Sequence, residues 1–390
     1  MTLRRGSAAF RALCVTLFAA GYSMFSLLYC AQALLPSFVQ DFGLTPAQSS
    51  LAVSCATIAV AASILVSGSL SDTLGRRAMV VTALLCAAVL TLAAAFAPTW
   101  PLLLVARGLM GLALGGMPSV LIAYVSEEVE VDSVGLATGI YISGSVFGGM
   151  SGRLLAGLMT DFWNWRVALA VLGGVSLLGA LYSAGALKPS THFVPQATTL
   201  QERLRRYMRP LRDAGLPWIF VAGCLLMGGF VTVYNYIGFR LLLPPYGLRP
   251  ASVSLVFALY LVGMASSTWA GALAGRYGRR HLYWPAVCLM TAGIALTMAR
   301  PLALVAAGVG LMTFGFFGAH SLASSWVGLR GKECRAQAAS LYLAGMYVGS
   351  SVAGWLGGFA WAAYRWPGVA GMVLATQCVA LLIALKLSRL

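Results

Sequence analysis

The stretch GSLSDTLGRR, residues 68–77, places one aspartate and two arginines between two long apolar runs. A related stretch, GALAGRYGRR at residues 271–280, follows 203 residues later. The two copies share the first glycine, the leucine two residues after it, and the final glycine with the two arginines that follow it. Repetition of this kind predicts a chain that is built from two related halves.

The composition of the chain indicates a protein that lies in a membrane. Of its 390 residues, 60% are hydrophobic and only 9% are charged, whereas a soluble protein carries about 25% charged residues. Apolar stretches of about 20 residues, the length that a helix needs to cross a bilayer, recur along the whole chain. The sequence therefore predicts an all-α membrane protein. Its net charge of +16 is explained by basic loops between spans, so we expect no nucleic-acid partner.

Twelve apolar stretches predict twelve transmembrane helices in two groups of six. They divide the chain into an N-terminal six-helix bundle at residues 1–187, a cytoplasmic linker at 188–214 and a C-terminal six-helix bundle at 215–390. Within the linker, residues 199–212 predict a short amphipathic helix that lies along the lipid headgroups. The predicted spans are residues 11–38, 48–70, 79–97, 101–126, 134–160, 166–187, 215–243, 251–273, 282–299, 302–328, 334–360 and 367–386.

The basic residues predict which way the spans face. With the N-terminus inside, the inner segments hold 19 lysines and arginines and the outer segments hold five. This bias predicts that both termini are cytoplasmic. The first apolar run continues through Leu35, beyond the roughly 7–15 residues of a cleavable signal. We therefore expect a multi-pass protein of a bacterial inner membrane.

Two further matches connect the halves to a known family. YISGSVFG at residues 141–148 resembles YLAGMYVG at 342–349, and each pair of repeats runs in the same direction through the membrane. The loop pattern Gly-x-Leu-x-Asp-x-x-Gly-Arg-Arg resembles the signature of the major facilitator superfamily. The resemblance covers essentially the whole chain. It implies two pseudo-symmetric six-helix bundles, and secondary transport by alternating access.

The resemblance assigns the loop residues to a conformational latch on the cytoplasmic side. Arg76 would join Asp72 to an acid at the end of the fourth span, Glu127 or Glu128. The alternative is that Arg76 and Arg77 only set the topology. The second copy has Gly275 in place of the aspartate, which predicts a one-sided latch. The latch residues are Gly68, Asp72, Gly75, Arg76, Arg77 and Glu127, with Gly271, Gly278, Arg279 and Arg280 from the second copy.

The fifth predicted span carries a run of glycines that resembles the glycine-rich motif of the drug/proton antiporter branch of the family. Two positions depart from that motif, because Gly149 replaces its proline and Arg153 replaces its last glycine. The missing proline leaves open whether the helix is kinked. The alternative is ordinary packing of small residues against another helix. The motif residues are Gly135, Gly144, Gly148, Gly149 and Gly152.

By the same resemblance, the first, fourth, seventh and tenth spans line a substrate cavity. Buried arginines are costly in a membrane, so Arg107 and Arg153 are expected to face that cavity or a partner. The alternatives are that Arg107 extends to the headgroups, that Asn235 bonds another helix with Arg240 capping an outer end, and that His320 is a packing residue. The predicted cavity residues are Tyr29, Gln32, Arg107, Arg153, Tyr234, Asn235, Tyr236, Arg240, His320 and Ser324.

These features predict a proton-coupled exporter of small organic molecules, resembling arabinose-efflux-like permeases. All ten Asp and Glu residues lie in loops or at span ends, which leaves open a uniporter or symporter of a small organic anion or neutral solute. A receptor or scaffold that does not transport is a further alternative. The sequence lacks the nucleotide-binding and metalloprotease motifs of enzymes and any Cys-x-x-Cys pair, so we expect no enzyme, cofactor or metal site. The expected partners are a small organic substrate, protons and the lipid bilayer, and the expected state is a monomer.

Overall fold

The computed structural model describes residues 3, 6–188, 190 and 200–389, without the side chains of 68–74 and 200–204. The chain separates into two compact units. The first unit comprises residues 1–34 and 55–198, and the second comprises 35–54 and 199–390. Residues 35–54 group with the second unit because the Ser54 hydroxyl, for example, donates to the Ser351 carbonyl at 2.9 Å. The division of the chain into domains at residues 187 and 215 stays a prediction.

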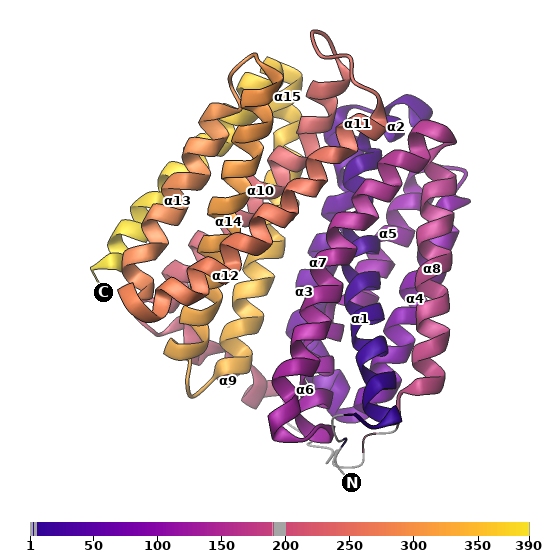
Figure 1. Ribbon diagram of the computed structural model, residues 1–390, viewed down its shortest axis with the longest axis vertical. Helices are drawn as coiled ribbons and strands as arrows, with labels where there is room; N and C mark the ends of the chain where they lie inside the picture. The colour runs from indigo at the N-terminus through magenta and orange to yellow at the C-terminus, as the bar shows by residue number, and fades with distance from the viewer. Residues whose placement is uncertain (1–2, 4–5, 189, 191–199, 390) are drawn as a thin grey trace. The chain divides into compact units, whose positions relative to one another are not determined.

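The first part of the chain forms eight helices in the described residues (Figure 1). Within the first unit, α1 runs alongside α7 and α8, and α4 packs on α5 and α8. The helices are α1 (Ala8–Tyr29), α2 (Ala31–Phe42), α3 (Pro46–Leu74), α4 (Arg76–Ala95), α5 (Trp100–Gly115), α6 (Met117–Glu128), α7 (Val131–Phe162) and α8 (Trp165–Ala186).

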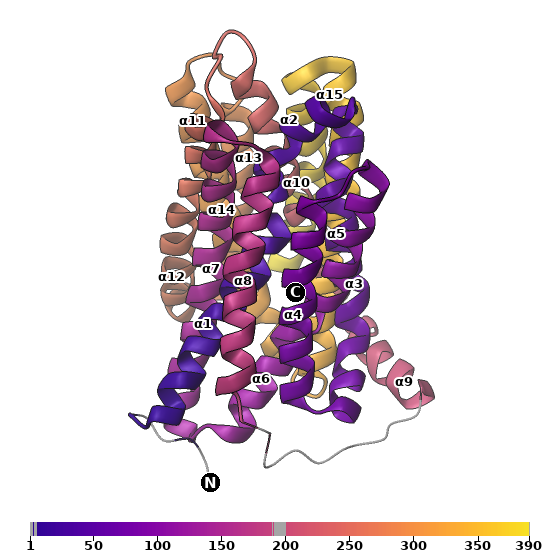
Figure 2. The same ribbon diagram turned by 90° about the vertical axis from the view of Figure 1, so that its right-hand side faces the viewer.

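The second part begins with the short helix α9 (Leu200–Leu211), which lies at the predicted position of the amphipathic linker helix. Figure 2 shows it at one end of the helices that follow. Within the second unit, α10 lies alongside α15, and α13 lies alongside α14. The remaining elements are α10 (Leu216–Leu242), α11 (Pro250–Ser254), η1 (Leu255–Leu259), α12 (Tyr260–Tyr277), α13 (Arg279–Leu296), α14 (Leu302–Arg330) and α15 (Arg335–Ser388).

The helices account for all twelve predicted spans. In the described part of the chain, nine helical stretches are long and apolar enough to cross a bilayer. The 54-residue α15 is one of these stretches and contains the last two predicted spans. Its backbone leaves the helical conformation at Tyr364 and Arg365, where the direction of the chain changes. Two more helices, α7 and α13, correspond to the predicted fifth and ninth spans.

In two spans the helical hydrogen bonding is interrupted at one residue, although the backbone there stays in the helical region, with φ −53° and ψ −34° at Cys30 and φ −82° and ψ −17° at Gly116. The first breaks at Cys30, between α1 and α2, and the fourth breaks at Gly116, between α5 and α6. The second break has a local cause, since Pro118 lacks an N–H group and leaves the Leu114 carbonyl without its usual helical donor. The first break has no proline or glycine beside it, and its cause lies in another helix.

Candidate functional site

Each arginine loop turns at a glycine with a backbone that other residues rarely adopt. Gly75 has φ 83° and ψ 149° before α4, and Gly278 has φ 79° and ψ 144° before α13. Positive φ carries no steric cost for glycine because it has no Cβ. The two loops therefore share a backbone conformation, and in each the arginine pair occupies the first turn of the next helix.

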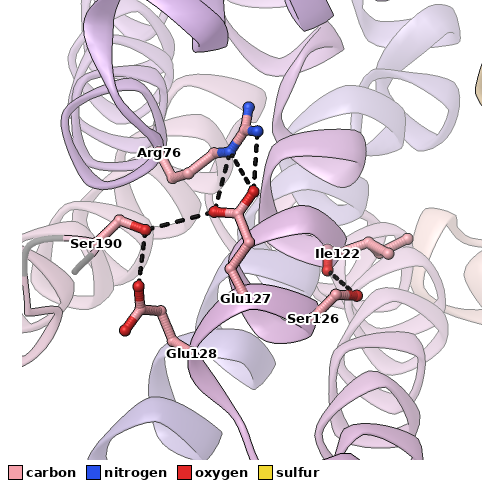
Figure 3. Close-up of polar contacts among 6 residues, drawn as sticks. All are labelled: Arg76, Ile122, Ser126, Glu127, Glu128 and Ser190. Carbon is pink, nitrogen blue, oxygen red and sulfur yellow. Dashed lines mark hydrogen bonds and ion pairs between the residues drawn. The ribbon is translucent and has the colours of Figure 1, made fainter. Parts of the chain in front are cut away.

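In the first unit, Arg76 forms an ion pair with Glu127 at the end of α6 (Figure 3). One guanidinium nitrogen lies 3.0 Å from the carboxylate, and Nε lies 3.3 Å from the same oxygen. The Ser190 hydroxyl donates to Glu128 at 2.9 Å and to Glu127 at 3.4 Å. This cluster ties the start of α4 to the end of α6. The side chain of Asp72 and the surroundings of Gly68 lie outside what the structure describes.

Arg77, the second arginine of the loop, caps a different helix. Its Nε donates to the Leu187 carbonyl and its terminal nitrogen to the Ala184 carbonyl, both at 2.7 Å. These carbonyls end α8, where the helix has lost its own donors and carries partial negative charge. Arg77 thus satisfies the last turn of α8 and does not join the Arg76 cluster.

The second copy of the loop makes weaker polar contacts. Arg279 donates from Nε to the Ser325 hydroxyl of α14 at 2.6 Å, so its acceptor is neutral. Arg280 and Gly271 are exposed, and a side chain on Gly271 would meet no other atom within 4 Å. The predicted latch residues are therefore brought to two separate places, one in each unit.

The glycine run of the fifth span packs α7 against α1. A Cβ atom on Gly144, Gly148 or Gly152 would overlap α1 at Phe18, Tyr22 or Ser26 respectively. Gly135 faces open space, and Gly149 faces the Arg153 side chain. The helix continues without interruption from Val131 to Phe162. Three of the five motif glycines thus pack closely against α1, and no break interrupts α7 at Gly149. The antiporter motif itself stays a prediction.

Arg153 is buried at the point where this packing ends. Its side chain is 2% exposed, and its Nε donates to the Gln32 amide oxygen at 2.6 Å. A second nitrogen donates to the Gly149 carbonyl, and the guanidinium lies 4.5 Å from the centre of the Tyr29 ring. The structure therefore brings together three of the predicted cavity residues.

Arg107 reaches the same part of α1 from α5. It is 1% exposed and donates to the carbonyls of Leu27 at 2.6 Å and Leu28 at 2.5 Å. In a regular helix these carbonyls would accept from residues 31 and 32. Arg107 is an alternative donor there, which accounts for the helix break at Cys30. An extension of Arg107 to the headgroups is thus excluded.

The break in the first span, residues 27–32, is therefore a meeting point of two buried arginines. The carbonyl end of α1 carries partial negative charge, which stabilises a cation beside it. A guanidinium within a span otherwise costs at least about 2.5–3.5 kcal/mol. The Asp and Glu residues of the chain all lie in loops or near span ends. The arrangement gives the middle of the first unit a positive electrostatic character.

The predicted cavity residues of α10 bond to neighbouring helices of the second unit. The hydroxyl of Tyr234 lies 2.8 Å from that of Thr313, and the hydroxyl of Tyr236 donates to the Gly354 carbonyl at 2.8 Å. Asn235 is 1% exposed and lies against Gly354. All three polar side chains are thus buried between helices.

Arg240 and His320 lie in different surroundings. Arg240 donates to the carbonyls of Thr297 and Ala299, the latter at 2.7 Å, and so caps the end of α13. His320 is half-buried in α14, and its Nδ1 lies 3.0 Å from the Tyr342 hydroxyl. Ser324, one turn further along α14, is exposed.

One ion pair was not predicted from the sequence. The Nε of Arg330 at the end of α14 lies 2.5 Å from Asp213, which precedes α10. Burial acts to raise the pKa of Asp213, but hydrogen bonds from Arg330 and from two backbone N–H groups outweigh it and hold that pKa below its usual value. The only sequence signal was an acid just before an apolar run. In the described residues, no cluster of His, Cys, Asp and Glu could hold a metal ion.

Known proteins match this chain closely. A model of the Major Facilitator Superfamily matches residues 12–248. The inner membrane transport protein YnfM of Escherichia coli (strain K12) is 44% identical over 99% of this chain and 93% of its own length. The uncharacterized MFS-type transporter YybF of Bacillus subtilis (strain 168) is 41% identical over 99% of this chain and 96% of its own length. The structure of a bacterial homologue of the human lysosomal transporter Spinster has a TM-score of 0.81 at 13% identity, covering 99% of this chain and 98% of that one.

Proposed function

Because the chain belongs to the major facilitator superfamily, we propose that it exports a small organic molecule by alternating access, coupled to protons. The family establishes the coarser statements: the chain is a multi-pass transporter and not an enzyme, and it has the major facilitator fold of twelve transmembrane helices in two pseudo-symmetric bundles. Proton coupling, export and antiport are the proposal, as are its place in a bacterial inner membrane with cytoplasmic termini and its monomeric state.

The observation that carries the proposal is the meeting of Arg107 and Arg153 at the break between α1 and α2. Interrupted membrane helices form substrate and ion sites in many transporters, because their backbone groups are no longer bound within the helix. Arg107 donates to two carbonyls of that break, and Arg153 bonds Gln32 immediately after it. A site of this kind can change its hydrogen bonds when a substrate or proton arrives.

A second candidate function, uniport or symport of a small organic anion, is favoured by the charge of the same site. Two guanidinium groups in a low-dielectric region attract an anion much more strongly than they would in water. Guanidinium also matches the planar shape of a carboxylate, with which it forms two parallel hydrogen bonds. A non-transporting receptor or scaffold has no such observation in its favour.

Reconstituted vesicles that contain a pH-sensitive dye test these functions. Benzoate, naphthalenesulfonate and tetraphenylphosphonium are added in turn, and both solute uptake and internal pH are followed. A pH change that depends on the solute, and that Arg107→Ala abolishes, supports proton-coupled transport. Uptake without a pH change supports uniport and contradicts proton coupling. Arg300→Ala, which changes an arginine in the loop between α13 and α14, is the control.

The ion pair of Arg76 and Glu127 supports a latch role for the first arginine loop. We propose that this pair holds the start of α4 against the end of α6 in one state of the transport cycle. Asp72 stays a predicted member of the latch. If so, Asp72→Asn increases the accessibility of cysteines placed at the cytoplasmic helix ends, and unchanged accessibility contradicts the latch.

A further inference from the structure

His320 lies on a face of α14 that packs inside the second unit. Phe316, one turn earlier, stacks on Phe230 of α10 with ring centres 4.0 Å apart. His320 continues this stack, with its ring 6.0 Å from Phe316 and 5.7 Å from Tyr342 of α15, and nearly parallel to both. The imidazole is therefore held in one orientation by rings from its own helix and from α15.

The hydrogen bond between His320 and Tyr342 suits both protonation states of the imidazole. A neutral Nδ1 accepts a hydrogen bond from the tyrosine hydroxyl, whereas a protonated Nδ1 donates one to the tyrosine oxygen. The 3.0 Å contact can serve either way, because only the hydroxyl hydrogen has to turn. A carboxamide in place of His320 could donate or accept a hydrogen bond, but it could not bind the proton.

Tyr283 of α13 is a second buried tyrosine in this region of the second unit. Its side chain is fully buried beside Tyr342. Its hydroxyl has no hydrogen-bond partner among the described residues. A buried hydroxyl without a partner is unfavourable, so Tyr283 can accept a hydrogen bond if the side chains around it rearrange.

The surroundings of the pair hold no charge that would fix the protonation state of His320. In the described residues, no charged side chain interacts with His320 or Tyr342. Tyr283 is the titratable neighbour on α13, α10 presents Gly223 to the Tyr342 ring, and α12 presents the Ser267 carbonyl to the residue after His320. Protonation would therefore change this region from neutral to positive.

A proton can also reach the imidazole. His320 is only half-buried, and Ser324, one turn further along α14, is exposed. Tyr342, in contrast, is 2% exposed. Tyr342 is therefore the buried member of the pair, and a proton can approach His320 from the Arg330 end of α14.

We propose that the His320–Tyr342 pair is the site that binds and releases the coupled proton of this transporter. This inference rests on the proposed function, which requires a group that carries the proton. The carboxylates of the chain lie in loops or near span ends, and His320 is the group that we propose for this role. The proton binds to the imidazole, the hydrogen bond to Tyr342 reverses, and release restores the neutral pair.

A direct test follows the protonation of His320 without any transported solute. The chain has three histidines, so nuclear magnetic resonance of histidine-labelled protein in lipid nanodiscs gives few signals, and His320→Gln identifies the one of interest. We expect this signal to report protonation between pH 4 and pH 9, with a midpoint that Tyr342→Phe shifts. His281→Gln is the matched control, since His281 is exposed and contacts the Tyr277 carbonyl. A His320 signal that is constant over this range, or a midpoint that Tyr342→Phe leaves unchanged, would overturn the proposal.

The dye-filled vesicles separate this inference from the proposed function. Here the measured quantity is the number of protons moved per molecule of the solute that gave the wild-type signal. We expect His320→Gln to lower this ratio at least tenfold and His281→Gln to leave it unchanged. Wild-type vesicles that move solute without protons contradict the proposed function. Wild-type and His320→Gln vesicles with equal ratios contradict the role of His320 alone.

Discussion

The crossing of α1 with α7 in the first unit and the crossing of α10 with α15 in the second are built on the same glycine spacing. In each unit, two glycines four residues apart bring one helix close to the backbone of the other. The matching positions lie 201 residues apart on the glycine helices and 202 apart on their partners. The glycine and partner pairs are Gly144 with Phe18, Gly148 with Tyr22, Gly345 with Phe220, and Gly349 with Cys224.

The side chains that follow the two crossings differ. Arg153 follows the glycines of α7, whereas Gly354 stands at the matching position of α15 and accepts a hydrogen bond from Tyr236. The first unit thus buries guanidinium groups where the second buries hydroxyl groups and aromatic rings. The repeat therefore preserves the close approach of the backbones, while the polar chemistry of each unit has diverged.

The largest loss of stability is expected when a Cβ atom is added at the shared glycines. Gly148→Ala and Gly349→Ala should each destabilise the protein by about 1–3 kcal/mol, because the methyl group overlaps backbone atoms that cannot move aside easily. Melting temperatures of the purified variants in detergent measure the loss. Similar losses would confirm that the two crossings are equivalent.

The matched controls are glycines of the same two helices that face open space. A Cβ atom on Gly135 in α7 or on Gly371 in α15 would meet no other atom within 4 Å. Alanine at either position should leave the melting temperature unchanged or raise it, since alanine favours a helix over glycine. If Gly148→Ala melts at the same temperature as Gly135→Ala, close packing is not the role of the shared glycines.

The sequence predicted most of the fold because apolar length determines a membrane helix locally. It also placed Arg76 near Glu127, through a family pattern. It did not predict the break at Cys30, because its cause is Arg107, 79 or 80 residues away from the carbonyls that it contacts. The partners of Arg153 and Arg330 were missed for the same reason, since long-range contacts leave no local pattern. The hydrogen bonds of Tyr234 and Tyr236 to other helices were not predicted either, because they depend on tertiary packing. The place of these residues in a substrate cavity stays a prediction.

A smaller difference in stability is expected between the contacts of the two arginine loops. Arg76 contacts a carboxylate and Arg279 contacts a hydroxyl. A double-mutant cycle of Arg76→Gln with Glu127→Gln should give a coupling energy of about 1 kcal/mol, since the pair is only partly exposed to water. The cycle of Arg279→Gln with Ser325→Ala should give less, because its acceptor is neutral. Unfolding of each variant in detergent measures both energies.

Salt separates the two contacts further. Raising the ionic strength from 0.1 M to 1 M shortens the screening length from about 10 Å to about 3 Å. The coupling between Arg76 and Glu127 should therefore fall, while that between Arg279 and Ser325 should stay nearly constant. Equal salt dependence in both cycles would contradict the difference between the loops.

The smallest effect on stability is expected for the ion pair at the end of α14. Arg330 ends α14 and pairs with Asp213, whereas the matching end of α6 carries Glu127, which pairs with Arg76. The pKa of Asp213 is lowered in the folded protein, so its carboxylate stabilises the fold above the unfolded pKa of about 3.9. That contribution is lost as the pH falls through the lower folded pKa.

Wild-type protein should therefore be more stable than Asp213→Asn at pH 6, by about 1 kcal/mol or less because the pair is partly exposed. The difference in free energy of unfolding should shrink as the pH is lowered toward 3. Arg330→Gln is the matched variant, and in its background Asp213→Asn should have a smaller effect with a weaker dependence on pH. A difference that stays constant from pH 6 to pH 3 would mean that the charge of Asp213 does not contribute, and that its hydrogen bonds to the start of α10 account for its role.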